Sequence, residues 1–505
     1  MAHVILERLQ NHFGEGPVSP QDVRDLLRKL KVEESLIDCA LQAFEADEHL
    51  TWKGLVSWIF DCSEARPVNH HGISPKDLPD AAEPAKARAR KIREALEMTA
   101  ERFADYMHLL AKFPRRCEIA RTELRGITLK QLRVVEDFIV QHAGEWWLDV
   151  RSKRPVDPAT ANLYHVSTWL IMPATSTADC AWVELAAGGE QRPQWFCSHW
   201  WGEPVRDFIG CVAKHKEVRC FKTNPGYWVC AYANRQHSLD EELSSDPKSS
   251  SFFKALQLVE GMLIILDTNA TPFTRLWCAF EAYTALSERT DGNQHLLLDI
   301  ATKVPGTDSA ALLTDGLTEA EKQLESALEE KGQGPTRGPP PQGMGPMGAS
   351  LAKRLQLYRQ RAFTLEVLSR GLRPQLHEAL ASKAEDRRRI LNCIAQKDLD
   401  AEPAGQHVNY DAVNTSLGGI FARAGLEQAL LKGQVQELSF HEALRADTSC
   451  SELKLDLTHM SPSDARLADL GLCIPRSLQR LQMDLGGCEE WTAQGLAALV
   501  REHRR

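Results

Sequence analysis

The residues best suited to chemistry stand in the segment TRLWCAFEAYTAL, residues 274–286. Trp277 and Glu281 are four residues apart, so a helix would place both on one face near its N-terminus, where the helix dipole favours a carboxylate. A carboxylate beside a large aromatic side chain can stabilise an oxocarbenium-like ribosyl cation, the charge that develops in glycosidic cleavage. The spacing allows this chemistry at Glu281, while the structural alternative is a glutamate that offsets the helix dipole and a tryptophan that packs on the sheet.

Polar side chains follow three apolar segments that read as strands: WFCSHWW, YWVCAYAN and GMLIILD. The carboxyl ends of parallel strands meet at one edge of a sheet, where ligand sites collect. We therefore expect a substrate site there, with Trp residues available to stack on a base. The candidate substrate-binding residues are Ser198, His199, Trp200, Trp201, Gly202, Asn234, Arg235 and Trp277, and the same edge carries Gln236, His237, Asp267, Thr268 and Asn269.

Strand-like and helical segments alternate through residues 191–304, which predicts an α/β domain with a parallel sheet and crossover helices. The strands are expected at 195–201, 227–234, 261–267 and 295–301. The helices are expected at 203–216, 250–260 and 275–288.

Two motifs in this domain resemble the TIR (Toll/interleukin-1 receptor) family. FCSH ends the first strand, and LIILD is followed by TRLWCAFE, in which Trp277, Cys278 and Glu281 match a W-C-x-x-E motif. SHWWGEP and RLWCAFE also resemble segments of dinoflagellate and algal proteins. The resemblance implies a flavodoxin-like sheet. In TIR enzymes the glutamate of this motif is essential for cleaving the nicotinamide–ribosyl bond of NAD, which implies Glu281 as the catalytic residue and NAD as substrate, with no bound cofactor.

A non-enzymatic adaptor is the alternative function, because many TIR domains act as scaffolds. This sequence also departs from the enzyme pattern. Arg275 stands where the motif has a serine, and no segment after Asn234 matches the loop that gates the TIR site. Under either hypothesis, self-association through the TIR-like domain is expected.

Metal binding and thiol chemistry are two further hypotheses for this edge of the sheet. Cys197, His199, Cys230 and His237 could be imagined as ligands, but both cysteines fall within expected strands and should face away from the edge, so no metal site is expected. Cys278 with His199 would form a hydrolase pair if the helix N-terminus lowered the thiol pKa, yet no oxyanion-hole glycines accompany them.

Length and composition indicate a cytosolic protein of several domains, and the resemblance to the TIR family implies a signalling role. The 505 residues carry a net charge of -9, which argues against nucleic acid as a partner. The 13 cysteines include no C-x-x-C pair, which argues for reduced thiols. The longest apolar run, residues 262–266, is too short to span a membrane, and no membrane contact is expected.

The N-terminal part is expected to be mainly helical. Residues 1–66 resemble a degenerate EF-hand, in which Ala43 and Gly54 occupy the first and twelfth loop positions and calcium should not bind. Residues 67–147 read as a linker and a helical region, with one helix striped by apolar residues over 92–110. Residues 148–190 read as a lead-in with strands at 165–172 and 181–187.

Three regions are expected after the α/β domain: a Pro/Gly-rich linker at 305–350, a helical region at 351–430 and a leucine-rich-repeat-like fragment at 431–505. Strands are expected in the fragment at 435–440, 451–457 and 478–485. Leu453 and Leu455 recur 28 residues later as Leu481 and Met483. Two repeats are too few for a free solenoid, so these strands should rest on the preceding helices or on a protein partner.

Overall fold

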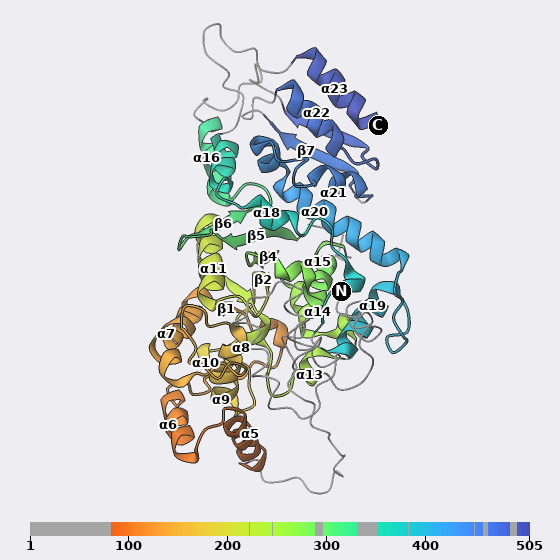
Figure 1. Cartoon of the computed structure of the whole chain (residues 1–505). Helices are drawn as coiled ribbons and strands as arrows, with labels where there is room; N and C mark the ends of the chain where they lie inside the picture. The colour runs from red at the N-terminus through yellow and green to blue at the C-terminus, as the bar shows by residue number, and fades with distance from the viewer. Residues whose placement is uncertain are drawn as a thin grey trace, which may run out of the picture. The chain divides into compact units, whose positions relative to one another are not determined.

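The computed structural model describes residues 82–221, 223–244, 246–287, 296–330, 351–381, 383–448, 450–457, 463–484 and 492–504 (Figure 1). The chain divides into two compact units, residues 1–77 with 382–384 and residues 78–381 with 385–505. The structure reported below is that of the second unit. The EF-hand-like segment and the Pro/Gly-rich stretch at 331–350 lie outside the described residues.

A mixed sheet of six strands, in the order β1-β3-β2-β4-β5-β6, organises this unit (Figure 1). Strands β3, β2, β4 and β5 are parallel, whereas β1 and β6 pair antiparallel at the two edges. The predicted α/β class is confirmed, with a sheet that is mixed and not purely parallel. The strands are β1 Ile127–Thr128, β2 Trp195–Ser198, β3 Gly226–Trp228, β4 Gly261–Leu266, β5 Leu297–Lys303 and β6 Ala310–Leu313.

Helices connect the parallel strands, as right-handed crossovers require. The segment between β2 and β3 contains α11, that between β3 and β4 contains α12, α13 and α14, and that between β4 and β5 contains α15. The helices are α5 Ala82–Ala95, α6 Ala100–Leu110, α7 Leu129–Trp146, α8 Leu163–Val166, α9 Met172–Thr175, α10 Trp182–Ala186, α11 Val205–Arg219, α12 Cys230–Ala233, α13 Leu239–Leu243, α14 Ser251–Leu256, α15 Leu276–Ser287, α16 Glu319–Glu330, α17 Leu351–Gln360, α18 Leu365–Ser369, α19 Ala384–Ala395, α20 Val408–Lys432, α21 Phe440–Ala446, α22 Asp464–Cys473 and α23 Ala493–Arg504. Short helical turns are η1 Thr122–Leu124, η2 Ser167–Ile171, η3 Pro247–Ser249, η4 Thr271–Thr274 and η5 Leu376–Glu378.

Strand β4 is buried along its whole length, because the sheet carries an apolar core on each face. Side chains alternate between the faces, so Met262 and Ile264 belong to the first core and Leu263 and Ile265 to the second. The second core is completed by helices from residues 82–219.

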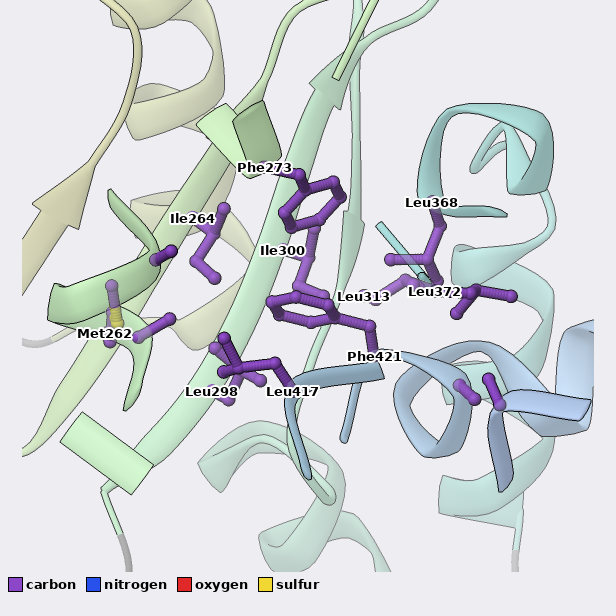
Figure 2. Packing of buried hydrophobic residues seen from close by; sticks show 14 of the residues in the cluster. Met262, Ile264, Phe273, Leu298, Ile300, Leu313, Leu368, Leu372, Leu417 and Phe421 are labelled. Atoms are coloured by element: carbon purple, nitrogen blue, oxygen red, sulfur yellow. The ribbon is translucent and has the colours of Figure 1, made fainter. Parts of the chain in front are cut away.

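The first core continues from the sheet into the C-terminal helices. Phe273, which follows β4, packs against Phe421 of α20 with ring centroids 4.5 Å apart. Figure 2 shows both rings close to Ile300 of β5, with Leu368 and Leu372 beyond them. The sheet and the helices of residues 363–430 therefore share one apolar interior.

Three segments predicted as strands are not strands, and a fourth, YWVCAYAN, is a strand only at its start. Residues 165–172 and 181–187 form α8, η2, α9 and α10. In YWVCAYAN the strand β3 stops at Trp228 and the rest is α12, and residues 435–439 form turns before α21. The first error has a clear cause. Val166, Trp169 and Leu170 are all buried, and an apolar run without an exposed face does not distinguish a buried helix from a strand.

Two further boundaries differ from prediction. The helix expected over 92–110 is broken into α5 and α6, because Glu97 has a positive φ of 53° and Thr99 caps the new helix by accepting a hydrogen bond from the Arg102 amide. The linker expected from residue 305 instead begins with β6, which extends the sheet, and α16. Apolar residues 310–313 carry this strand, and the Pro/Gly composition belongs to the later residues.

The C-terminal residues form two strand–helix units. β7 (Glu452–Asp456) pairs in parallel with β8 (Arg480–Asp484), and α22 and α23 follow them. Leu453 pairs with Leu481 and Leu455 with Met483, so the 28-residue period of the sequence is the register of the two strands.

None of the helices in the described ranges combines the length and the apolar character that crossing a membrane needs.

Candidate functional site

Ser198 and Glu281 meet at the C-terminal end of β2. Ser198 is the last residue of β2, and Glu281 lies in the second turn of α15, which follows the neighbouring strand β4. The Ser198 hydroxyl donates a hydrogen bond of 2.6 Å to Oε2 of Glu281. Ser198 is 1% exposed and Glu281 is 5% exposed. The fold thus brings two of the candidate residues together in a dry place.

Burial controls the ionisation of Glu281. It raises the pKa of Glu281 to about 8, because a carboxylate loses its hydration in the interior, while the hydrogen bond from Ser198 favours the charged form and opposes the shift. Glu281 is therefore mostly a neutral acid at pH 7. It would ionise near pH 8, or at lower pH with a cation beside it.

A second buried pair lies directly after Ser198. Nδ1 of His199 is 3.1 Å from Oε1 of Glu203, and the imidazole packs against Phe208. Burial lowers the pKa of His199 to about 4 and holds the pKa of Glu203 well above its usual range. Both shifts favour the uncharged forms of the two side chains. Among the described residues, Nε2 of His199 has no hydrogen-bond partner.

Glu203 was not among the residues that the sequence singled out. Its signal was the spacing H-x-x-x-E within the apolar turn that follows the first strand. With Glu203 included, two buried carboxyl groups lie near the end of β2. Glu281 is hydrogen-bonded to Ser198, and Glu203 is hydrogen-bonded to His199.

Trp277 does not share a site with Glu281, although the two are four residues apart. Its ring stacks on Phe252 at a centroid distance of 5.0 Å, and its indole N–H donates to Oδ2 of Asp386 in α19 at 3.1 Å. Trp277 is therefore engaged in packing, and a stacking role for it needs a rearrangement.

The thiol of Cys278 is poorly suited to nucleophilic chemistry. Its Sγ donates to the backbone carbonyl oxygen of His199 at 3.7 Å, and the imidazole of His199 is bonded to Glu203 instead. Burial raises the pKa of Cys278, with the negative charge of Glu281 adding to the shift. The lowered pKa that the thiol hypothesis requires is therefore not found, because burial raises the pKa of this thiol.

The tryptophans of the first turn are held by packing. The indole N–H of Trp201 donates to Sγ of Cys230 at 3.2 Å, and its ring lies beside Tyr164. The Trp200 ring covers Gly202 so closely that a Cβ at Gly202 would lie 2.2 Å from it. Gly202 therefore allows the Trp200 ring to pack closely here, because glycine has no Cβ.

The residues after β3 form a separate polar cluster. Arg235 donates from Nε to Oε1 of Glu242 at 2.7 Å, and Arg125 donates to the same oxygen at 3.0 Å. Asn234 is buried, and its Oδ1 has no hydrogen-bond partner among the described residues. Gln236 donates to the backbone carbonyl oxygen of Ala231. These contacts hold the loop and involve neither Ser198 nor Glu281.

A small cavity lies beside Ser198 on the side of the first core. It has room for about one water molecule. Apart from Ser198 and Cys278 its walls are apolar: Ile264, Pro272, Phe273, Ala279, Ala282, Pro374, Leu417 and Phe421. This cavity is too small for any ligand of nucleotide size.

Metal ligands do not gather here. Across the ranges that the structure describes, no three or more His, Cys, Asp or Glu side chains are placed to hold a metal ion. Cys230 begins α12 and is not in a strand, and its sulfur accepts the Trp201 hydrogen bond.

Comparisons with known proteins give no relative for this fold and site: no protein-family model, no curated protein and no solved structure matches the chain.

Proposed function

We propose that residues 191–304 form a TIR-like domain that cleaves the nicotinamide–ribosyl bond of NAD, with Glu281 as the catalytic carboxylate. The observation that carries the proposal is the buried 2.6 Å hydrogen bond between Ser198 and Glu281 at the end of β2. The strand order β3-β2-β4-β5 adds support. In such doubly wound sheets, ligands bind at the carboxyl end of the strand whose two neighbours follow it in the chain.

The chemistry requires the ionised form of Glu281. Cleavage breaks the bond between C1′ of the ribose and the pyridinium nitrogen, which keeps the electron pair, so that nicotinamide leaves as a neutral pyridine and a positive charge develops on the ribose. Glu281 as carboxylate stabilises that charge, and water then adds to C1′ and loses a proton. The bound pyridinium cation lowers the pKa of Glu281 towards neutrality, since an opposite charge favours the carboxylate.

Ser198, His199 and Glu203 each have a role in the proposed reaction. The Ser198 hydroxyl fixes the orientation of Glu281 and partly offsets the effect of burial on its pKa. The uncharged pair of His199 and Glu203 holds the first turn without adding a net charge next to the developing cation. Ser198 is thus a positioning residue in the proposal, and His199 and Glu203 stabilise the turn that follows it.

A non-enzymatic adaptor that self-associates through this domain is the second candidate. The observation that favours it is the small size of the cavity beside Ser198, which holds about one water molecule. Trp277, which would stack a base, is bonded to Asp386 instead. In this function the repeat strands β7 and β8 would offer a protein partner its contact surface.

Nicotinamide release from NAD tests the proposal. The full chain, alone and artificially clustered, is incubated with NAD near pH 8, and free nicotinamide is measured by chromatography. We expect release by the wild type and a loss of at least a hundredfold in Glu281→Gln, which keeps the shape and the Ser198 hydrogen bond but cannot ionise.

Glu217→Gln is the matched control, because Glu217 is an exposed glutamate on α11 paired only with Lys214 among the described ion pairs. It should leave the rate unchanged. Equal release by wild type and Glu281→Gln would remove Glu281 from the reaction. No release by any form, including the opened variants described below, together with concentration-dependent association, would leave the adaptor.

A further inference from the structure

Residues 371–380, here called the strap, cross the edge of the sheet where the candidate site lies. They connect the helical turn after α18 with the segment before α19. At one end Gly371 is packed on Phe273, so closely that a Cβ there would lie 2.2 Å from the ring. Pro374 lines the same cavity as Ser198 and Cys278.

The far end of the strap is bonded to the residues that begin α15. The Leu380 amide donates to the Thr274 carbonyl oxygen at 2.8 Å, and the Leu276 amide donates to the Leu380 carbonyl oxygen at 2.8 Å. These two bonds make an isolated parallel bridge between Arg275 and Leu380. Just beyond the strap, Asp386 accepts the Trp277 indole hydrogen bond. The bridge at Leu380 and the hydrogen bond of the Trp277 indole thus both hold the first turn of α15, the helix that contains Glu281.

Residues 372 and 376 of the strap also contact α20. The Leu376 amide donates to Oδ1 of Asn414 in α20 at 3.1 Å, and Leu372 lies against Gly418 of the same helix. Leu380 by contrast is 40% exposed. The bridge can therefore open while the core below it stays packed.

We propose that the strap is a gate: in its closed position it seals the site at the end of β2, and release of the bridge at Leu380 opens the path past Pro374 to Ser198 and Glu281. The significance of the gate rests on the proposed function of this site, but its movement does not. Because Cys278 lines the same cavity, its thiol reports opening without any catalysis.

Thiol labelling, read residue by residue by mass spectrometry, tests the gate in the full chain. Leu380→Pro removes the amide that donates to Thr274, and the residue before it is already extended, as a proline requires. Leu380→Ala keeps the amide and is the matched control. Asp386→Ala removes the acceptor of the Trp277 bond at an independent position.

We expect Leu380→Pro and Asp386→Ala to label Cys278 at least about tenfold faster than the wild type, and Leu380→Ala to match the wild type. Cys473, buried in α22 far along the chain, measures unfolding and should keep its rate. The gate is refuted if Cys278 labelling stays at the wild-type rate in both variants, or rises only in parallel with Cys473.

The same variants separate the gate from the catalytic proposal. Faster Cys278 labelling together with faster nicotinamide release supports both. Faster labelling with no nicotinamide release keeps the gate and rejects NAD cleavage. Nicotinamide release that is equal in wild type and variants, with unchanged labelling, keeps the reaction and rejects the gate.

Discussion

Glu281 shows how the surroundings of one residue decide what it can do. A helix-terminal carboxylate at the surface would be a charged capping group, whereas this one is buried and receives a hydrogen bond from Ser198. Its pKa of about 8 leaves the proton on at pH 7. At pH 7 Glu281 therefore has little negative charge with which to stabilise a cation. It gains that charge when the site opens to solvent or when a positive charge is placed beside it.

The raised pKa predicts how stability depends on pH. The folded pKa of Glu281, about 8, lies above its ordinary value of 4.5, so the folded state holds the proton more tightly than the unfolded state. Its contribution to stability is therefore complete below pH 4.5 and is lost as the pH rises towards 8. In Glu281→Gln this loss disappears. We expect the stability of the variant relative to wild type to increase by on the order of 4 kcal/mol between acidic and basic pH.

Urea unfolding of both proteins near pH 5, pH 7 and pH 9 measures this difference. Glu217→Gln, at the exposed position on α11, should differ from wild type by a constant amount. A stability difference for Glu281→Gln that is the same at all three pH values would mean that Glu281 ionises normally in the folded chain.

Sequence patterns predicted where the residues of the site lie in the fold, but not which side chains they contact. Ser198 and Glu281 could both be placed at one sheet edge, because a polar residue that ends a buried strand and a helix that follows the neighbouring strand meet there. The orientation of Trp277 could not be foreseen. It depends on Asp386, 109 residues further along the chain, and no local spacing encodes that contact.

At the scale of elements, the clearest predictions came from segments whose two sides differ or whose flanks carry turn residues. GMLIILD became β4, and the residues of α11 and α15 were predicted to within a few positions. The repeat register between β7 and β8 was visible as a 28-residue period. Segments buried on all sides were misassigned, such as α8 to α10, because periodicity carries no information once every face is apolar.

Helix α20 should be sensitive to volume where the strap crosses it. A Cβ at Gly418 would lie 2.3 Å from the carbonyl oxygen of Leu372, a backbone atom that cannot turn aside. Gly418→Ala should therefore destabilise the fold by about 1–3 kcal/mol. Gly210→Ala in α11 is the matched control, because a Cβ there meets nothing within 4 Å. It should stabilise by up to about 1 kcal/mol, the usual gain of replacing glycine in a helix.

Denaturant midpoints of the two glycine variants measure these changes. Opposite signs are expected for Gly418→Ala and Gly210→Ala. If Gly418→Ala also stabilised the chain, the strap would not be pressed against α20, and the anchoring that the gate requires would be absent.

At the scale of the whole second unit, the sheet packs against one apolar core on each of its two faces. The second core joins it to the helices of residues 82–219, and the first core joins it to the helices that follow residue 351. The C-terminal helices are thus not an appended domain. They cover the sheet face on which Ile264 and Ile300 lie, and in the proposed gate the site opens locally at the strap while this core stays packed.

A shared first core predicts that damage in α20 is felt in the sheet. Phe421, 2% exposed, packs on Phe273 in this core (Figure 2), and Phe421→Ala should cost about 3–5 kcal/mol. Hydrogen exchange of backbone amides should then speed up by about a hundredfold or more in α20 and in β4 and β5 alike, because these elements open as one cooperative unit.

Tyr358→Ala supplies the comparison, since Tyr358 is an aromatic residue of α17 that is 72% exposed and should leave exchange in both places unchanged. Faster exchange confined to α20 in Phe421→Ala would mean that the C-terminal helices open independently of the sheet. The site at the end of β2 could then be uncovered by release of the whole helical region, and the strap would be one part of a larger moving element.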